Sequence, residues 1–278
     1  MASKNLIIGG FTNYGINQLK PWVVSAKEVA GDNDVVLVYG IASGETLEWL
    51  KDQGVKCYSM INTPGVPIHV LRFLSIYNYL FHNWKQYKYV VTTDVKDVIF
   101  QSDPFSDLIG HKLVIASEGL KYKDEPWGNE NLYQAYGEYV YEEFKNNEIF
   151  NVGTFGGQSE YVKDMVFHIF TNGVNRPIPI VDQAVFNVLI NTQPFKDVVH
   201  KTNKWAAELG TIMDPSKIEQ FRPNLLIVEP FFVDGLLKDY TDKVFPIVHQ
   251  YDRVPELKKF VQEKFGQNDE SQYFIYRT

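Results

Sequence analysis

The stretch that decides the fold reads Val90-Val91-Thr92-Thr93-Asp94-Val95-Lys96-Asp97-Val98-Ile99-Phe100. An apolar run typical of a buried strand ends on the carboxylate of Asp94, and a second carboxylate, Asp97, follows three residues later. In a continuing strand these two side chains would point to opposite faces of the sheet. If the chain turns after Asp94, both can converge on one Mg²⁺ or Mn²⁺ ion, since such ions commonly bind one or two protein carboxylates together with phosphates and water. Two Asp residues also suit an ordinary turn, so the spacing alone leaves both interpretations open.

Short apolar runs alternate with helical periodicity ahead of this stretch. The alternation predicts strands over residues 5–10, 34–40, 55–60 and 87–93, and helices over residues 15–30, 44–53 and 68–84. It indicates βαβ units, and therefore an α/β fold with a mostly parallel central sheet flanked by helices. The pattern is looser afterwards, where we expect strands over residues 112–117, 151–156, 225–229 and 244–249 and helices over residues 130–144, 159–171, 182–191 and 255–265. No internal repeat or linker interrupts the chain, so residues 1–278 are predicted to form one domain.

The composition restricts the partners and the compartment. A net charge of −7 without any run of Lys or Arg argues against nucleic acid, because phosphate backbones are bound by basic surfaces. The single cysteine, Cys57, cannot form an intramolecular disulfide, which suits a reducing compartment. The N-terminus lacks the apolar core of a signal peptide, and no apolar stretch is long enough for a transmembrane segment. We therefore expect a cytoplasmic protein, and the sequence leaves its oligomeric state open.

The loop after the first predicted strand is a candidate ligand site, because ligands of open α/β sheets bind beyond the carboxyl ends of the strands. It is rich in glycine and polar groups and comprises Gly10, Phe11, Thr12, Asn13 and Tyr14. Glycine allows close backbone approach, while the Thr, Asn and Tyr side chains offer hydrogen bonds and a stacking face. The loop matches neither a Walker motif nor the Gly-x-Gly-x-x-Gly fingerprint. It is therefore a candidate for binding a base or a sugar ring rather than a phosphate.

Residues 89–105 (YVVTTDVKDVIFQSDPF) resemble the GT-A fold glycosyltransferases, which place an Asp-x-Asp motif or a variant of it after their fourth strand. In that family the carboxylates hold the metal ion bound to the diphosphate of a nucleotide-sugar donor. The spacing here is Asp-Val-Lys-Asp instead. That departure leaves open whether Asp97 binds the metal directly.

Three more segments are most similar to the retaining enzymes of glycosyltransferase family 8. The sequence FNVGTFGG (150–157) is similar to the family's Asn-x-Gly strand, whose backbone lines the sugar pocket, and the resemblance assigns this role to Asn151 and Gly153. The sequence VDQAVFN (181–187) is similar to a helix start whose Asp contacts donor-sugar hydroxyls and whose Gln lies beneath the anomeric carbon, here Asp182 and Gln183. His249 ends a late apolar run, at the place of the family's third protein ligand to the metal. A helix cap would also explain Asp182, and a structural role would also explain His249.

The resemblance implies a GT-A fold in which about residues 1–110 form a nucleotide-binding half and about residues 111–278 form an acceptor and catalytic half. It also implies that the loop over residues 10–14 holds the nucleoside, usually uridine. Arg72 lies within an apolar helical pattern, so it should meet either an acid or a donor phosphate or sugar. Trp127 lies in a segment, residues 122–131, that is typical of a loop. It is either a platform for stacking a saccharide acceptor or a side chain packed to anchor the loop.

The activity implied is the transfer of a hexose or pentose, with galactose or glucose the best candidates, from a UDP-sugar donor to a saccharide acceptor, as in glycan biosynthesis. The transfer would be assisted by Mn²⁺ or Mg²⁺ and would retain the anomeric configuration. Three alternatives stay open. They are a sugar-phosphate nucleotidyltransferase, an inverting GT-A enzyme with Asp182 as the base, and a sugar-binding scaffold without catalysis.

Overall fold

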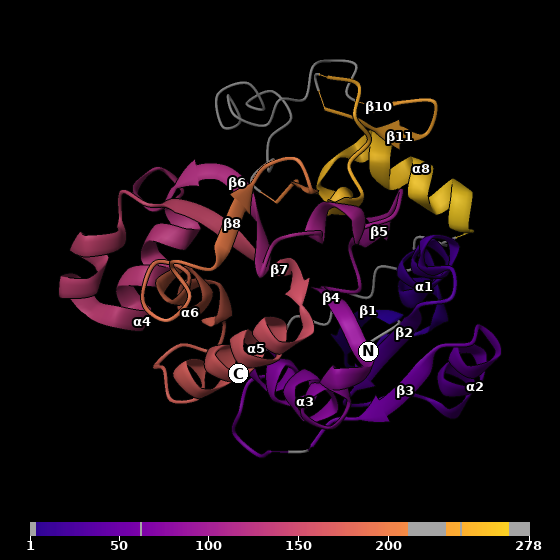
Figure 1. Cartoon of the computed structure of the whole chain (residues 1–278), viewed down its shortest axis with the longest axis horizontal. Coiled ribbons are helices and arrows are strands. Elements are labelled where there is room, and N and C mark those ends of the chain that lie inside the picture. The colour runs from indigo at the N-terminus through magenta and orange to yellow at the C-terminus, as the bar shows by residue number, and fades with distance from the viewer. Residues whose placement is uncertain (1–3, 62, 211–231, 240, 267–278) are drawn as a thin grey trace.

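The computed structural model describes residues 4–61, 63–210, 232–239 and 241–266 (Figure 1). Its main sheet has seven strands in the order β3-β2-β1-β4-β7-β6-β8. Their bounds are β1 (Lys4–Phe11), β2 (Asp34–Tyr39), β3 (Lys56–Ser59), β4 (Tyr87–Thr93), β6 (Leu113–Lys121), β7 (Glu148–Gln158) and β8 (Val199–Thr202). A smaller sheet contains β5 (Val98–Phe100), β12 (Ile247–His249) and β9 (Ala206–Glu208), and a hairpin pairs β10 (Phe232–Val233) with β11 (Leu236–Leu237).

Helices cover both faces of the main sheet. The α-helices are α1 (Ile16–Ala30), α2 (Gly44–Asp52), α3 (Ile68–Asn83), α4 (Pro126–Phe144), α5 (Ser159–Gly173), α6 (Asp182–Leu189) and α8 (Pro255–Phe265). Short 3₁₀ turns are η1 (Trp84–Gln86), η2 (Ser106–Leu108), η3 (Tyr122–Asp124) and η5 (Tyr251–Arg253). No helix in the described ranges is both long and apolar enough to cross a membrane.

The α/β prediction is confirmed, and the seven-stranded sheet is mixed because one strand, β7, runs against the other six. Strands β3, β2, β1 and β4 run parallel to one another, as βαβ units require. Strand β7 then runs antiparallel to both of its neighbours, β4 and β6, while β8 pairs parallel to β6. The sheet therefore joins strands from both predicted halves of the chain.

The two faces of the sheet arise from the alternation of side chains along its strands. In β1, Leu6 and Ile8 pack into the cluster under α3 and α5, whereas Ile7 packs with residues of α1 on the opposite face. Strand β2 alternates in the same way and lies parallel to β1, with Leu6 opposite Asp34 and Ile7 opposite Val35. Such strands are apolar on both faces because helices bury both.

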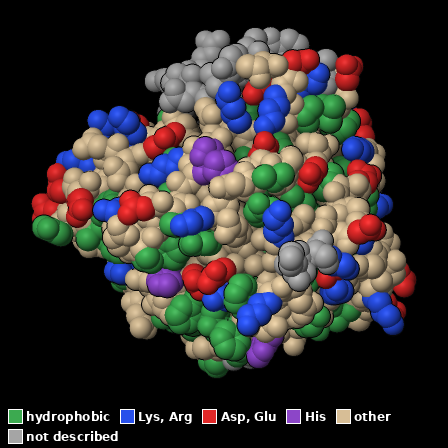
Figure 2. Space-filling model, viewed as in Figure 1, with side chains coloured by type: hydrophobic (Ala, Val, Ile, Leu, Met, Phe, Trp, Pro, Cys, Tyr) green, Lys and Arg blue, Asp and Glu red, His purple; other side chains and the backbone are tan. Residues whose placement is uncertain are grey.

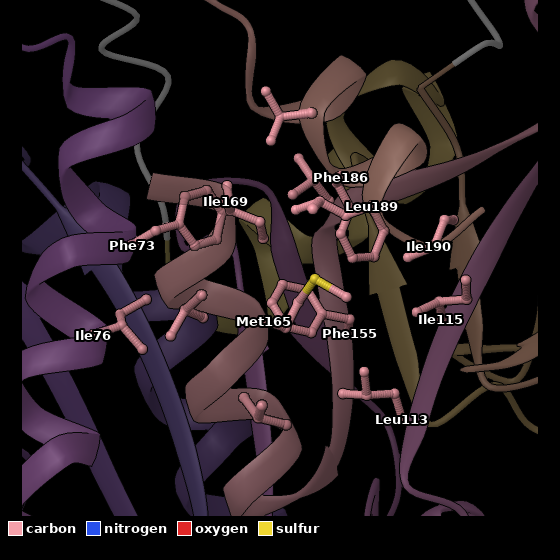
Figure 3. Close-up of a cluster of buried hydrophobic side chains, with 14 of the residues drawn as sticks. Phe73, Ile76, Leu113, Ile115, Phe155, Met165, Ile169, Phe186, Leu189 and Ile190 are labelled. Carbon is pink, nitrogen blue, oxygen red and sulfur yellow. The ribbon is translucent and has the colours of Figure 1, made fainter. Parts of the chain in front are cut away.

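Figure 3 shows how the larger cluster is assembled from elements far apart in sequence. The labelled side chains come from α3, β6, β7, α5 and α6 and point toward one another. They are Phe73, Ile76, Leu113, Ile115, Phe155, Met165, Ile169, Phe186, Leu189 and Ile190. This packing fixes the ends of β6, β7 and α6, which carry polar side chains of the candidate site.

Several boundaries differ from those predicted. The strand predicted over residues 112–117 continues to Lys121, and the late strand predicted over residues 244–249 is confined to Ile247–His249. The segment 122–131, expected to be a loop, instead forms η3 and the first turn of α4. Pro126 suits that first turn, and the Glu125 side chain caps it by accepting hydrogen bonds from the backbone N–H groups of Trp127 and Gly128. The strand predicted over residues 225–229 lies outside the described residues.

The surface has no continuous basic stripe on the face seen in Figure 2, where Lys and Arg side chains are interspersed with Asp and Glu. This distribution agrees with the net charge of −7.

Candidate metal centre and adjoining pocket

The chain turns after Asp94, which is the condition for both carboxylates to converge on one ion. Strand β4 ends at Thr93 in the main sheet, and β5 begins at Val98 in the smaller one. Two backbone hydrogen bonds hold the turn, one from the N–H of Asp94 to the carbonyl of Gly153 (2.7 Å) and one from the N–H of Gln250 to the carbonyl of Asp97 (2.7 Å). The turn therefore lies between β7 and the end of β12.

His249 joins the two carboxylates at this turn. It ends β12, which pairs antiparallel to β5 and places His249 opposite Val98. Its Nε2 lies 3.5 Å from Oδ2 of Asp94 and 3.7 Å from Oδ1 of Asp97. One ligand atom from each of the three residues lies within 4.8 Å of the others. The structure thus brings together the three side chains that the sequence singled out as metal ligands.

The donor set suits a divalent cation. Nε2 of His249 is buried and makes no hydrogen bond to any described residue. A buried nitrogen that faces two carboxylates can be satisfied either by protonation, which pairs it with them, or by a cation that all three side chains bind. Two carboxylate oxygens, completed by phosphate oxygens and water, suit Mn²⁺ or Mg²⁺, and the imidazole favours Mn²⁺, the transition metal of the two.

Glu208 supports the histidine from behind, and the sequence analysis missed it. Nδ1 of His249 lies 2.6 Å from Oε2 of Glu208, and both side chains are buried, with 1% and 0% of their surface exposed. The hydroxyl of Thr154 donates to the other carboxylate oxygen. A hydrogen bond from Nδ1–H to Glu208 leaves the lone pair of Nε2 free for a metal. The signal was a Glu within the apolar run Trp205-Ala206-Ala207-Glu208-Leu209.

We expect Glu208→Ala to weaken Mn²⁺ binding by about 10- to 100-fold, the usual effect of removing a carboxylate that orients a metal-binding histidine. Glu208→Gln keeps an oxygen that can accept the Nδ1–H hydrogen bond, so it should weaken binding less. Isothermal titration of Mn²⁺ into the three proteins measures both effects. Equal affinities in all three would show that Glu208 does not orient a metal ligand.

Arg72 bridges two carboxylates beside this centre. It donates one hydrogen bond to Oδ1 of Asp94 and another to Oδ2 of Asp182, the latter 3.0 Å long. Of the two interpretations of Arg72, the acid partner is therefore present, and Arg72 also lines the cavity described below.

The charges around Arg72 and His249 shift several pKa values. Burial opposes the ionisation of Asp94, but Arg72 and His249 together hold its pKa below the ordinary value. Burial raises the pKa of Asp97 to about 6, and the negative charges of Asp94 and Asp252 add to this effect. Burial disfavours protonated His249, yet the carboxylates around it raise its pKa well above the usual value. An excess of negative charge therefore collects at this turn, as a cation site requires.

A cavity of about 720 Å³ opens from the centre, large enough for a sugar nucleotide fragment. Its wall includes Asp94 and His249 on one side and the sequence-predicted residues Arg72, Asn151, Asp182 and Gln183. Asp97 is not part of the wall. The cavity therefore joins the metal centre to the residues that the resemblance assigns to the donor sugar.

Gly153 lies where β7 passes closest to the centre. A Cβ atom at this position would lie 2.5 Å from Cε1 of His249 and 2.8 Å from Oδ2 of Asp94. The backbone N–H of Gly153 donates to Oδ1 of Asn151 over 2.7 Å. Glycine is therefore the residue that lets the strand, the histidine and the carboxylate meet.

The loop over residues 10–14 lies outside the cavity wall. Phe11 is buried in the core near Tyr14 and Tyr39, with ring centroids 6.4 and 6.1 Å away. The Thr12 hydroxyl accepts a hydrogen bond from the backbone N–H of Ile41, and Asn13 is exposed with a left-handed φ of 56°. Gly10 packs against Arg72, whose Cβ would lie 3.1 Å from an added Cβ. The loop follows the same sheet edge as Asp94, and its binding role stays a prediction.

A second carboxylate that the sequence analysis missed lies in the cavity wall. Glu118 is on β6 and only 5% exposed, and it accepts hydrogen bonds from the amides of both Asn151 and Gln183. A signal was available, because Glu118 directly follows the strand predicted over residues 112–117. The rule that drew attention to Asp94 applies equally to it.

Comparison with known proteins adds no relative: no protein-family model matches the chain, and no curated protein matches its sequence. The function therefore has to be argued from the residues of the site.

Proposed function

We propose that this chain is a metal-dependent glycosyltransferase of GT-A type that transfers a hexose or pentose from a UDP-sugar to a saccharide acceptor. One observation carries the proposal. Asp94, Asp97 and the orphaned nitrogen of His249 converge at the edge of a cavity whose wall also holds Asp182 and Gln183. A cation site joined to hydrogen-bonding groups for a sugar is what transfer from a nucleotide sugar needs.

The residues divide into two sets. Asp94, Asp97 and His249 would hold Mn²⁺ or Mg²⁺, which supplies neutralising charge for the leaving diphosphate. Arg72 lies between Asp94 and Asp182, so its positive charge connects the metal side of the cavity to the sugar side. Asp182 and Asn151 offer groups for sugar hydroxyls, and Gln183 is the candidate neighbour of the anomeric carbon.

We propose that the transfer retains the anomeric configuration, because the position of Asp182 weakens its case as the base of an inverting enzyme. An inverting enzyme needs a carboxylate base facing the acceptor, and Asp182 was the candidate. Its carboxylate accepts a hydrogen bond from Arg72, and the residue is only 4% exposed, so it is not free to act as a base. NMR analysis of the product anomer tests the assignment, because a β-linked product from an α-linked donor would show inversion.

The direct test is a donor hydrolysis screen. Purified protein is incubated with a panel of UDP-, GDP- and dTDP-sugars, with Mn²⁺ or with EDTA, and release of nucleoside diphosphate is measured. We expect release from at least one UDP-sugar that depends on Mn²⁺. Thermal stabilisation by UDP and Mn²⁺ without any turnover would support the sugar-binding scaffold, and exchange of pyrophosphate would support a nucleotidyltransferase.

Trp127 provides a prediction for the acceptor. It is 49% exposed, lies in the first turn of α4 and lines the cavity together with Ile180, which is 41% exposed. Large apolar side chains left exposed in a cavity wall suit the apolar face of a sugar ring. We expect Trp127→Ala to raise the KM for the acceptor about fivefold, since an aromatic contact contributes about 1 kcal/mol.

Tyr139→Ala is the matched control for this variant. Tyr139 is on the same helix and 85% exposed, but it does not line the cavity. It should leave both the KM for the acceptor and kcat unchanged. An unchanged KM in Trp127→Ala would exclude the stacking role.

A further inference from the structure

Glu118 is a buried carboxylate that no cation among the described residues pairs with. It forms no ion pair with any residue in the described part of the chain, in contrast to Asp94 and Asp182, which share Arg72. Burial raises the pKa of Glu118 to about 7, with the charge of Glu208 adding to the effect. Because the pKa is raised from 4.5, the fold loses stability as the pH rises from about 4.5 to about 7, and the loss is complete above that pH. Stability alone therefore does not explain a carboxylate here.

One oxygen of Glu118 accepts two hydrogen bonds. Nδ2 of Asn151 lies 2.7 Å from Oε1, and Nε2 of Gln183 lies 2.7 Å from the same atom. Asn151 is on β7 and Gln183 is on α6, so Glu118 connects side chains from two separate elements. Oε1 accepts both of these bonds, and no described residue donates a bond to Oε2.

The other end of each amide is also fixed. Oδ1 of Asn151 accepts the backbone N–H of Gly153 at 2.7 Å, and Oε1 of Gln183 accepts the backbone N–H of Val152 at 3.3 Å. The oxygen of each amide is thus assigned to a backbone donor and its nitrogen to Glu118. An amide nitrogen carries two hydrogens, so one N–H of each amide remains for a further partner.

All three side chains line the cavity. A hydrogen bond to an ionised carboxylate is stronger than one to a neutral oxygen, so above about pH 7 the ionised Glu118 holds the two amides more firmly than a neutral acceptor would. A sugar hydroxyl both donates and accepts a hydrogen bond. The remaining amide N–H groups and the second oxygen of Glu118 offer it the complementary set.

We propose that Glu118 is a positioning residue for the transferred sugar. It holds the Asn151 and Gln183 amides in a single orientation toward the cavity, and these amides contact the sugar. This inference rests on the proposed function, in which Gln183 lies beside the anomeric carbon. Without the carboxylate, each amide nitrogen loses its fixed partner and the side chain of Gln183 can rotate. Positioning errors of this kind lower the rate of the chemical step more than they lower binding of the nucleotide.

The test compares Glu118→Ala with Glu118→Gln. Two quantities are measured: kcat for release of UDP from the best UDP-sugar, and the Kd of UDP with Mn²⁺ by isothermal titration. We expect Glu118→Ala to lower kcat about 100-fold and to leave the Kd within about twofold of wild type. Glu118→Gln retains an oxygen that can accept both amide hydrogen bonds, so it should recover about tenfold of the loss.

Glu148→Ala is the matched control. Glu148 is exposed, is on the neighbouring strand β7, and accepts a hydrogen bond from Ser117, the residue before Glu118, but it does not line the cavity. It should leave kcat unchanged. A wild-type kcat in Glu118→Ala would overturn the inference, as would a loss of UDP–Mn²⁺ binding equal to the loss of kcat. Failure of the wild-type protein to bind UDP with Mn²⁺ would instead refute the proposed function.

Discussion

Replacing Asp94 by Asn or Ala is expected to lower metal-dependent kcat by at least about a thousandfold, because a bound metal ion contributes several kcal/mol to stabilising the charge that develops on a leaving diphosphate. Asp94 contacts both Arg72 and His249 as well as the cavity. It accepts a hydrogen bond from Arg72, lies 3.5 Å from Nε2 of His249, and lines the cavity. The same variants should bind Mn²⁺ at least about 100-fold more weakly, since they remove a charged ligand of the ion.

The two substitutions separate charge from shape. Asp94→Asn keeps the volume of the side chain and one hydrogen-bond acceptor for Arg72, so only the ligand charge is lost. Asp107→Ala serves as the control, because Asp107 pairs with Lys243 away from the cavity. Titration of Mn²⁺ and turnover of the UDP-sugar are measured on all the proteins. Asp94→Asn with unchanged Mn²⁺ affinity would contradict the assignment of Asp94 as a metal ligand.

Asp94 could be predicted from sequence because local rules were sufficient. An apolar run predicted the strand, ligands collect at the carboxyl ends of parallel strands, and a turn was the simplest way for two carboxylates three residues apart to meet. The structure has that turn, and the strand boundary at Thr93 agrees with the prediction. The same alternation predicted β1 to β4 and the helices between them.

The parts that were missed depend on pairing between distant segments. Nothing local indicates that β7 runs antiparallel between β4 and β6, or that the short strand β9 pairs with β12. Glu208 reaches His249 only through that second pairing, which places the two residues opposite each other. Strands of three residues carry too little periodicity to be identified, so their contribution to the site was not predicted.

Residues 122–131 were predicted to form a loop, but they form η3 and the start of α4. The Glu125 side chain accepts capping hydrogen bonds from the backbone N–H groups of Trp127 and Gly128. Together with the proline at the first helical position, this cap starts a helix there. Trp127 is consequently held on a regular element rather than on a loop. A rigid position suits a stacking platform, since less conformational freedom is lost when a ring binds to it.

Gly153→Ala is expected to weaken Mn²⁺ binding at least about 100-fold although alanine removes no ligand, because the new methyl group displaces two of them. The added Cβ would lie 2.5 Å from Cε1 of His249 and 2.8 Å from Oδ2 of Asp94, both closer than carbon contacts allow. His249 cannot move aside easily, because its Nδ1 is bonded to Glu208 and its side chain is 1% exposed. Overpacking of this kind costs about 1–3 kcal/mol of stability, so the protein should still fold.

Gly44→Ala is the control for a glycine-to-alanine change in the same chain, since a Cβ there would contact nothing within 4 Å. It should leave both Mn²⁺ affinity and the unfolding midpoint close to wild type. For Gly153→Ala, Mn²⁺ titration is paired with urea unfolding, so that loss of the site is distinguished from loss of the fold. A cooperatively folded Gly153→Ala protein that binds Mn²⁺ as wild type does would mean that the ion is held elsewhere. That result would show that β7 does not border the metal site, and it would leave Asp94 and His249 with a purely structural role.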